Sequence, residues 1–242
     1  MTQSAAKPAQ SVDEVIERMR AIKARLDPRD GVACFNRMYL RVTELVGQRL
    51  AAGYFQDQVF IERLDVVFAN LYFDAVEAAE AGRPVNAAWR PLFDARGHRK
   101  VWPIQFAFAG MNAHTYHDLA LAVVETCIGR RTTPDTPPVH ADHLKVDELL
   151  AQVEAEERAS FEARIVKVAT AGAEPLKHIV ASFSIARARD AAWATTQTLW
   201  HQRNIRPMYD ATLAAVTAST ALAGRMLVTP VLAPVERPDG EG

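Results

Sequence analysis

His114 and Asp118 stand four residues apart in a segment whose other residues are mostly apolar. In an α-helix this spacing places the two side chains on one face, one turn apart. An imidazole beside a carboxylate can act as a general base, because the carboxylate holds the ring in one tautomer, and the same pair can ligate a metal ion. The spacing therefore predicts a catalytic or metal-binding role for both residues. The alternative is a buried hydrogen-bonded pair that only fixes how the helices pack.

Two further groups of residues could join a metal site at this place. His117 lies about 60° round the helix from His114, at ~100° per residue, and is a weaker ligand that we expect to be partly exposed. His140, Asp142 and His143 form a second cluster, which could complete a two-helix site, although Asp142 is also suited to cap its own helix. The cofactor that such ligands would bind is a divalent metal ion.

Other side chains are candidates for binding a substrate beside the same helix. Arg189 could hold an anionic group, and Trp193, one turn further along, could stack on its guanidinium. Tyr72, Trp89 and Trp193 could form apolar walls, and Asn112 could act as a polar anchor. For each of them the alternative is packing or pairing between helices.

The helix that must position these residues is predicted from Pro103 to about residue 128, with Gly129 just past its end. Residues 101–129 contain no Lys or Arg, and a helix this apolar on nearly every side belongs at the centre of a protein. Gly110, one turn before the histidine, leaves room for a neighbouring helix or a ligand. Polar side chains within such a helix need partners, because an unpaired buried group costs roughly 1–3 kcal/mol.

The whole chain has the composition of one helical domain. Of its 242 residues 49% are hydrophobic, and helical periodicity recurs along it without a convincing strand. We therefore predict an all-α fold, a single bundle of seven to eight helices around the buried central helix at about 103–128. Residues 1–10 are expected to be a disordered tail, residues 11–228 the single domain, and residues 229–242 a loose C-terminal tail.

Charge and patterning exclude several classes of function. The 28 basic and 29 acidic residues nearly cancel and form no basic tract, so no nucleic-acid partner is expected. The polar centre of the 101–129 segment argues against a membrane span, and the first residues lack the apolar core of a secretory signal. With only Cys34 and Cys127, expected to be buried thiols, the chain is predicted to be cytoplasmic. Its oligomeric state is left open.

Four segments of the chain resemble a known family, the actinobacterial domain of unknown function numbered 5995. They are ERLDVVFANLYFDAV at 62–76, AWRPLF at 88–93, QFAFAGMNAHTYHDLALAVV at 105–124 and ARARDAAWATTQTLW at 186–200. The resemblance extends from about Val12 to Leu222 and implies an all-helical protein. It implies no activity, so it assigns no catalytic residue, but it places Asn112, His114 and Asp118 inside the motif that typifies the family.

These observations lead to one functional prediction and two alternatives. We predict a small cytoplasmic enzyme of specialised metabolism that acts on a largely apolar small molecule in a pocket beside the central helix. The first alternative is a non-catalytic helical protein that binds such a ligand. The second is a structural or interaction module in which the buried polar residues only fix helix register.

Overall fold

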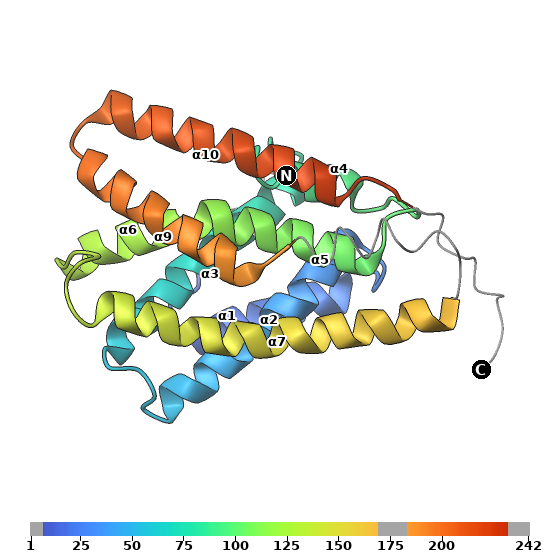
Figure 1. Cartoon of the computed structure of the whole chain (residues 1–242), viewed down its shortest axis with the longest axis horizontal. Helices are drawn as coiled ribbons and strands as arrows, with labels where there is room; N and C mark the ends of the chain where they lie inside the picture. Colours follow the sequence, from blue (N-terminus) through green and yellow to red (C-terminus); the bar gives the residue numbers. More distant parts are fainter. Residues whose placement is uncertain (1–6, 169–182, 232–242) are drawn as a thin grey trace.

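One continuous helix runs through the middle of the molecule. The computed structural model describes residues 7–168 and 183–231. Its central helix consists of α5 (Pro103–Asn112), a π-helical turn η1 (Ala113–Asp118) and α6 (Leu119–Arg130), drawn in green in Figure 1. Nearly every side chain of α5 and η1 is buried, as expected for a helix that is apolar on almost all sides.

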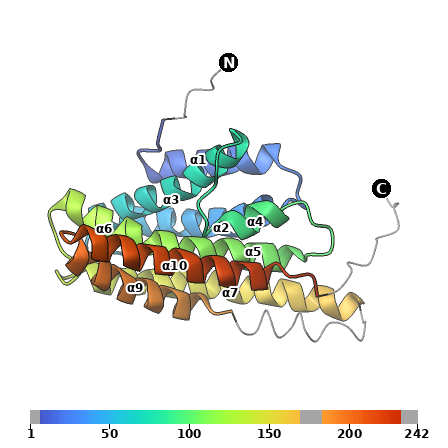
Figure 2. The same cartoon turned by 90° about the horizontal axis from the view of Figure 1, so that it is seen from above.

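Seven other helices surround this central one in the described part of the chain, so the prediction of an all-α bundle is confirmed. Figure 2 shows the central helix between a layer that contains α1, α2 and α3 and a layer that contains α7, α9 and α10. No described residue is in a strand. The surrounding helices are α1 (Val12–Arg25), α2 (Gly31–Ala51), α3 (Gln58–Glu80), α4 (Arg90–Ala95), α7 (Val139–Val168), α9 (Ile185–Gln202) and α10 (Arg206–Leu227).

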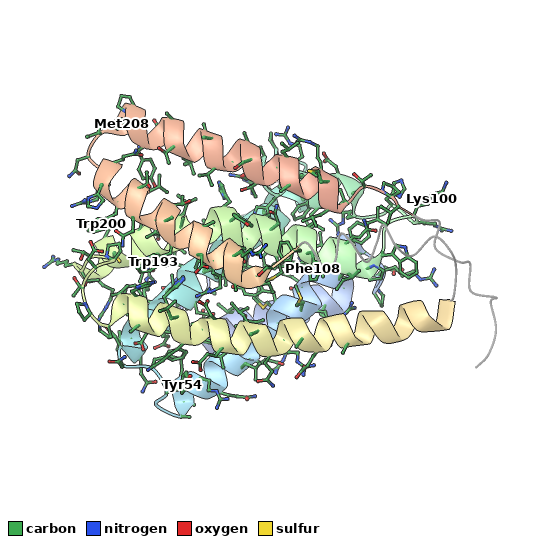
Figure 3. All side chains as sticks on the ribbon, in the orientation of Figure 1. Tyr54, Lys100, Phe108, Trp193, Trp200 and Met208 are labelled. Atoms are coloured by element: carbon green, nitrogen blue, oxygen red, sulfur yellow. The ribbon has the colours of Figure 1, made fainter. Side chains whose placement is uncertain are left out.

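Polar caps define where the first three helices begin. The side chains of Ser11, Asp30 and Asp57 each accept a hydrogen bond from a backbone N–H in the first turn of α1, α2 and α3, respectively. These bonds satisfy N–H groups that have no partner within the helix. Side chains then fill the space between the layers, whereas Lys100 and Met208 lie at the outer edge (Figure 3).

Close contact between α2 and the central helix depends on Gly110. A Cβ atom at this position would lie 2.3 Å from Cγ of Phe35, so the phenyl ring occupies the space of the missing side chain. The prediction that Gly110 lets a neighbouring helix approach is therefore confirmed. This contact brings α2 against the turn that carries His114.

The structure corrects two boundaries. Gly129 lies inside α6, and the helix continues to Arg130, with Arg131 as its C-cap in a left-handed conformation with φ 54°. The backbone N–H groups of Arg131 and Thr132 donate hydrogen bonds to the carbonyl oxygens of Ile128 and Cys127 in the last turn. These bonds stabilise a helix end that lies after Gly129. At the other end of the chain, Ala9 is buried and exchanges two hydrogen bonds with the side-chain amide of Asn70, so the chain joins the fold before residue 11.

The predicted tails fall partly on residues that the structure does not describe. Residues 1–6 and 232–242 lie outside the described ranges. Within these ranges the C-terminal end is packed against the core, because the carbonyl oxygen of Thr229 accepts a hydrogen bond from Gln105. None of the described helices combines the length and apolar character that crossing a bilayer requires.

Candidate active site

Asp118 is the centre of a buried hydrogen-bond network on the central helix. Its Oδ2 accepts from the indole Nε1 of Trp89 at 2.8 Å and lies 3.2 Å from Nδ1 of His114. Its Oδ1 lies 2.7 Å from Nδ1 of His117. All four side chains are almost completely buried. The carboxylate is therefore compensated by three donors and holds both imidazole rings by their Nδ1 atoms.

The charges within this network follow from burial and from these bonds. Burial alone would raise the pKa of Asp118, but the hydrogen bonds from His114 and His117 outweigh it, and the pKa lies below its usual value. Burial lowers the pKa of His114, although Asp118 opposes this effect. His114 is therefore a neutral imidazole near neutral pH. Because its Nδ1–H points to Asp118, its lone pair lies on Nε2.

His117 joins the network from within the π-helical turn. We expected His117 to be partly exposed. This was wrong, because the side chain is only 4% exposed. In η1 the backbone N–H of Leu119 bonds to the carbonyl of His114, five residues back, so the turn is wider than an α-helical one. Within this turn, Nδ1 of His117 lies 2.7 Å from Oδ1 of Asp118.

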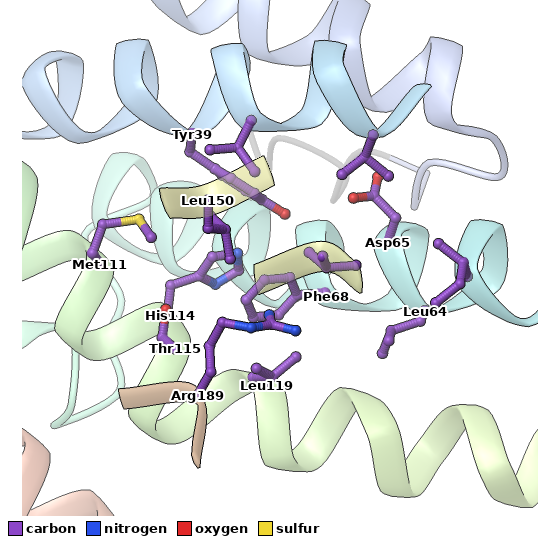
Figure 4. A pocket seen from close by; sticks show the side chains of 14 residues that line it. Tyr39, Leu64, Asp65, Phe68, Met111, His114, Thr115, Leu119, Leu150 and Arg189 are labelled. Atoms are coloured by element: carbon purple, nitrogen blue, oxygen red, sulfur yellow. The ribbon is translucent and has the colours of Figure 1, made fainter. Parts of the chain in front are cut away.

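A small cavity of about 50 Å³ lies beside His114, between the central helix and α2, α3, α7 and α9. Figure 4 shows it from close by, with the side chains that line it. Its walls are mostly apolar, and only Phe68 and Val146 among them are partly exposed. The lining residues are Tyr39, Val42, Val46, Ile61, Leu64, Asp65, Phe68, Met111, His114, Thr115, Leu119, Val146, Leu150 and Arg189.

Three polar atoms on the walls of this cavity are buried without a hydrogen-bond partner. They are the hydroxyl of Tyr39, Oδ2 of Asp65 and Nε2 of His114. Burial raises the pKa of Asp65 from 3.8 to about 7. Burial also raises the pKa of Tyr39 well above its usual value, the carboxylate of Asp65 adds to this effect, and the side chain of Thr43 opposes it. Unpaired buried polar groups are rare in folded proteins, and three around one cavity indicate a site for a ligand or for ordered water.

The ring of His114 is held firmly at the cavity wall. It stacks on Phe68 with 3.5 Å between ring centroids and an interplanar angle of 5°. Tyr39 contacts it edge-on, with the centroids 4.4 Å apart. These contacts and the bond to Asp118 leave the imidazole one orientation, so Nε2 occupies a defined position.

Arg189 reaches the same cavity from α9 but is already paired. Its Nε donates to Asp147, and its Nη2 donates to the backbone carbonyl of His143 at 2.8 Å. Of the residues predicted to bind a substrate, it alone lines the cavity. Its positive charge is compensated by Asp147 on α7, so it supplies a wall of the cavity rather than a free cation.

The other predicted substrate-binding residues lie elsewhere. Trp89 is positioned behind Asp118 rather than on the cavity wall, and Tyr72 donates its hydroxyl hydrogen to Asn36 at 3.2 Å. Trp193 stacks on the ring of His140 at 4.2 Å between centroids. Asn112 donates to the carbonyl of Thr220 on α10 and lines a separate groove of about 380 Å³. None of these four residues lines the cavity beside His114, so their roles in binding a substrate stay predictions from the sequence.

The metal interpretation gains no support from the geometry. The ring nitrogens of His114 and His117 that face Asp118 lie at hydrogen-bonding distance from its oxygens. No group of three or more His, Cys, Asp or Glu side chains among the described residues is arranged to hold a metal ion. The divalent metal ion therefore stays a prediction from the sequence.

The second predicted cluster has a structural role in the fold. The carboxylate of Asp142 is completely buried and accepts hydrogen bonds from the backbone N–H groups of Gln56 and Asp57, at 2.9 and 2.7 Å. These bonds fix the connection that leads into α3. His143 is buried beside it, but it is not among the residues that line the cavity.

Sequence reasoning missed Tyr39 and Asp65. Asp65 interrupts an apolar run, and together with Ile61, Phe68 and Tyr72 it follows the four- and three-residue steps of the buried face of α3. A carboxylate on the buried face of a helix was the feature of the sequence that could have identified Asp65 as a site residue. Tyr39 offered no comparable signal, because an aromatic residue on a buried helix face is ordinary core.

Comparison with known proteins places the chain in a family without an assigned activity. A family model described as a family of unknown function, DUF5995, matches residues 12–230. Neither the search of curated proteins nor the search of solved structures gave a match. The matched range includes the central helix and every residue that lines the cavity. The chain therefore belongs to the family of unknown function DUF5995.

Proposed function

We propose that this protein is a small cytoplasmic enzyme that moves a proton on a small, largely apolar molecule. His114 is the general base, and Asp118 is the residue that positions it. The single observation that carries the proposal is the state of the His114 imidazole. Its Nδ1 is held by a buried carboxylate, while its Nε2 is buried without a partner at the wall of an apolar cavity.

A neutral imidazole held in this way is suited to accept a proton. The carboxylate fixes the tautomer that leaves the lone pair on Nε2, and it stabilises the imidazolium that forms when a proton is taken up. Trp89 and His117 donate to the same carboxylate and keep it in place. They act as positioning residues, because neither lines the cavity.

The size and lining of the cavity limit the ligand. A cavity of ~150 Å³ holds a benzene ring, so a cavity of about 50 Å³ accepts only a few non-hydrogen atoms without movement of the helices. Its mostly apolar walls favour an apolar body with one or two polar groups. A purely structural core would be expected to pair its buried polar atoms, and three atoms here are left unpaired.

Non-catalytic binding of the same kind of ligand is the second candidate function. The apolar lining favours it, because apolar walls bind a ligand without requiring chemistry. The two candidates differ in one respect. Only the enzyme needs Nε2 of His114 to exchange a proton with the ligand.

The test is a search for ligands followed by hydrogen exchange. A collection of small uncharged compounds is screened for binding by ligand-observed NMR. Each compound that binds is then incubated with the protein in D₂O, and deuterium uptake at carbon is measured by mass spectrometry. His114→Gln removes the base. His143→Gln is the matched control, because it is also a buried histidine with an unpaired ring nitrogen but does not line the cavity.

We expect at least one bound compound to take up deuterium with the wild type and with His143→Gln, but not with His114→Gln. Binding without uptake in any of the three proteins would support the binding function instead. Uptake that is equal in all three would show that His114 is not the base. If no compound bound, the structural alternative would gain support.

A further inference from the structure

We infer that the substrate of this site is a small uncharged carbonyl compound, whose oxygen is bound by Tyr39 and Asp65 while His114 moves a proton at the adjacent carbon. This inference rests on the proposed function, because it needs His114 as the base. It adds the chemical class of the substrate and a second catalytic group across the cavity. The site would then interconvert the keto and enol forms of the ligand.

The three unpaired polar atoms come from three separate helices. Tyr39 lies on α2, Asp65 on α3 and His114 on the π-helical turn, and all three side chains line one cavity. Figure 4 shows the hydroxyl of Tyr39 and the carboxyl of Asp65 pointing toward the same part of it. Each atom is buried and makes no hydrogen bond of good geometry within the protein, although the side chain of Thr43 lies near enough to the Tyr39 hydroxyl to lower its pKa slightly against the effect of burial. The ligand is therefore expected to supply all three hydrogen bonds.

The protonation of the three groups indicates what that ligand looks like. The raised pKa of Tyr39 keeps its hydroxyl as a donor, and the pKa of about 7 for Asp65 leaves much of its carboxyl protonated near neutral pH, also as a donor. Nε2 of His114 is an acceptor. A carbonyl oxygen has two lone pairs, so it can accept from both donors at once. Nε2 of His114, which accepts, then faces a hydrogen on the carbon next to that carbonyl group.

The charges around the cavity favour a neutral ligand. Asp65 and Tyr39 face the cavity from α3 and α2, and His114 faces it from η1. The one permanent cation on its walls is Arg189 on α9, which is compensated by Asp147. The described residues of α7 on the lining, Val146 and Leu150, carry no charge. An anionic substrate would lack a free cation there, and it would lose its hydration among apolar walls.

The proton transfers of this reaction balance without a further reactant. Nε2 of His114 takes a proton from the carbon next to the carbonyl, and the electron pair of that C–H bond forms the carbon–carbon double bond. The carbonyl electrons move to oxygen, which takes the proton of the Asp65 carboxyl. Asp65 becomes a carboxylate, His114 becomes an imidazolium, and the ligand becomes an enol. The reverse transfers restore both residues. Tyr39 stabilises the oxygen throughout by its hydrogen bond.

The probes are acetone and hydroxyacetone in D₂O, with propan-2-ol as a ligand of similar size that lacks the carbonyl group. Loss of the proton signals next to the carbonyl is followed by ¹H NMR with wild type, Tyr39→Phe, Asp65→Asn and His114→Gln. Tyr116→Phe is the matched control, because Tyr116 lies on the same central helix but lines the separate groove. Urea unfolding checks that each variant is folded. Tyr39→Phe should be close to the wild type in stability, because its hydroxyl makes no hydrogen bond of good geometry and has only the Thr43 side chain as a polar neighbour on its own helix.

We expect exchange with at least one of the two ketones at a rate that Tyr116→Phe does not change. Loss of one donor to a developing oxyanion costs on the order of 10²-fold in rate, so Tyr39→Phe and Asp65→Asn should each slow exchange by about that factor. The wild-type rate should fall as pH rises through about 7, and Asp65→Asn should lack this fall.

Three results would overturn the inference in distinguishable ways. Exchange that needs His114 but is unaffected by Tyr39→Phe and Asp65→Asn would overturn it and leave the proposed base in place. If neither ketone exchanged but a ligand of another class showed exchange that depends on His114, the carbonyl inference would likewise be overturned and His114 would remain the proposed base. Exchange that is equal with His114→Gln would overturn the proposed function as well.

Discussion

Replacing Asp65 by Asn should stabilise the protein by an amount that grows with pH. Burial raises the pKa of Asp65 from 3.8 to about 7, so the folded state holds a proton that the unfolded state releases. Between these two pH values the folded state binds more protons, and the free energy of unfolding therefore falls as pH rises. Asn is close in shape to the protonated carboxyl but does not titrate. The variant should therefore escape this loss.

The size of the stability difference follows from the difference between the pKa of Asp65 in the unfolded and folded states. The interval from 3.8 to about 7, at ~1.4 kcal/mol per pH unit, corresponds to about 4 kcal/mol. The stability of wild type and Asp65→Asn should be similar near pH 4. The difference in favour of the variant should reach about 2 kcal/mol midway through the interval and about 4 kcal/mol above pH 7.

The assay is urea unfolding of both proteins at about pH 4, 5.5 and 8, with the stability difference between them compared across pH. Other titrating groups contribute equally to both proteins and cancel in this difference. Asp74→Asn is a control on the same helix. Partial burial raises the pKa of Asp74 as well, but Arg18 and Arg83 oppose this effect and the residue is exposed, so its pH dependence should be smaller than that of Asp65→Asn. A stability difference for Asp65→Asn that stays constant with pH, or that shrinks as pH rises, would refute the reasoning.

Three further predictions follow from the packing and the buried network. Gly110→Ala should destabilise the protein by about 1–3 kcal/mol, because the new Cβ would lie 2.3 Å from the packed ring of Phe35. Gly129→Ala should instead stabilise the protein by about 0.5–1 kcal/mol, because a Cβ at that helical position meets nothing within 4 Å. The midpoints of urea unfolding of both variants, compared with the wild type, measure these changes in stability. Equal changes for the two variants would contradict the packing argument. Trp89→Phe should lower the free energy of unfolding by about 2–4 kcal/mol, since it removes indole packing and leaves Asp118 one donor short; a loss below about 0.5 kcal/mol would show that the bond matters little. Metal analysis of purified wild type and His114→Ala should show no near-stoichiometric metal that depends on His114, and such a metal would restore the metal interpretation.

Local patterns in the sequence were enough to predict the helical architecture. The apolar 101–129 segment indicated a central helix, and Pro103 marked its first turn, as the structure confirms. Capping and periodicity depend on neighbours within a few residues, so they can be read without knowledge of the tertiary structure. The later end of the central helix was missed, because Arg131 closes it in a conformation more typical of glycine.

The candidate site was predictable only in part. The spacing of His114 and Asp118 predicted a contact that the structure shows at 3.2 Å. The π-helical turn, within which His117 contacts the same carboxylate, was not predictable from spacing, because spacing arguments assume an α-helix of constant pitch.

The sequence alone determined the helix content, the central position of the 101–129 segment and the His114–Asp118 pair, since each depends on residues close together in the chain. Only the tertiary structure decided which groups share the cavity. Tyr39 and Asp65 come from different helices, and their hydrogen-bonding atoms meet Nε2 of His114 only because α2 and α3 pack against the central helix. The same packing removes water from these groups and shifts the pKa of Asp65 to about 7, because burial penalises the charged carboxylate.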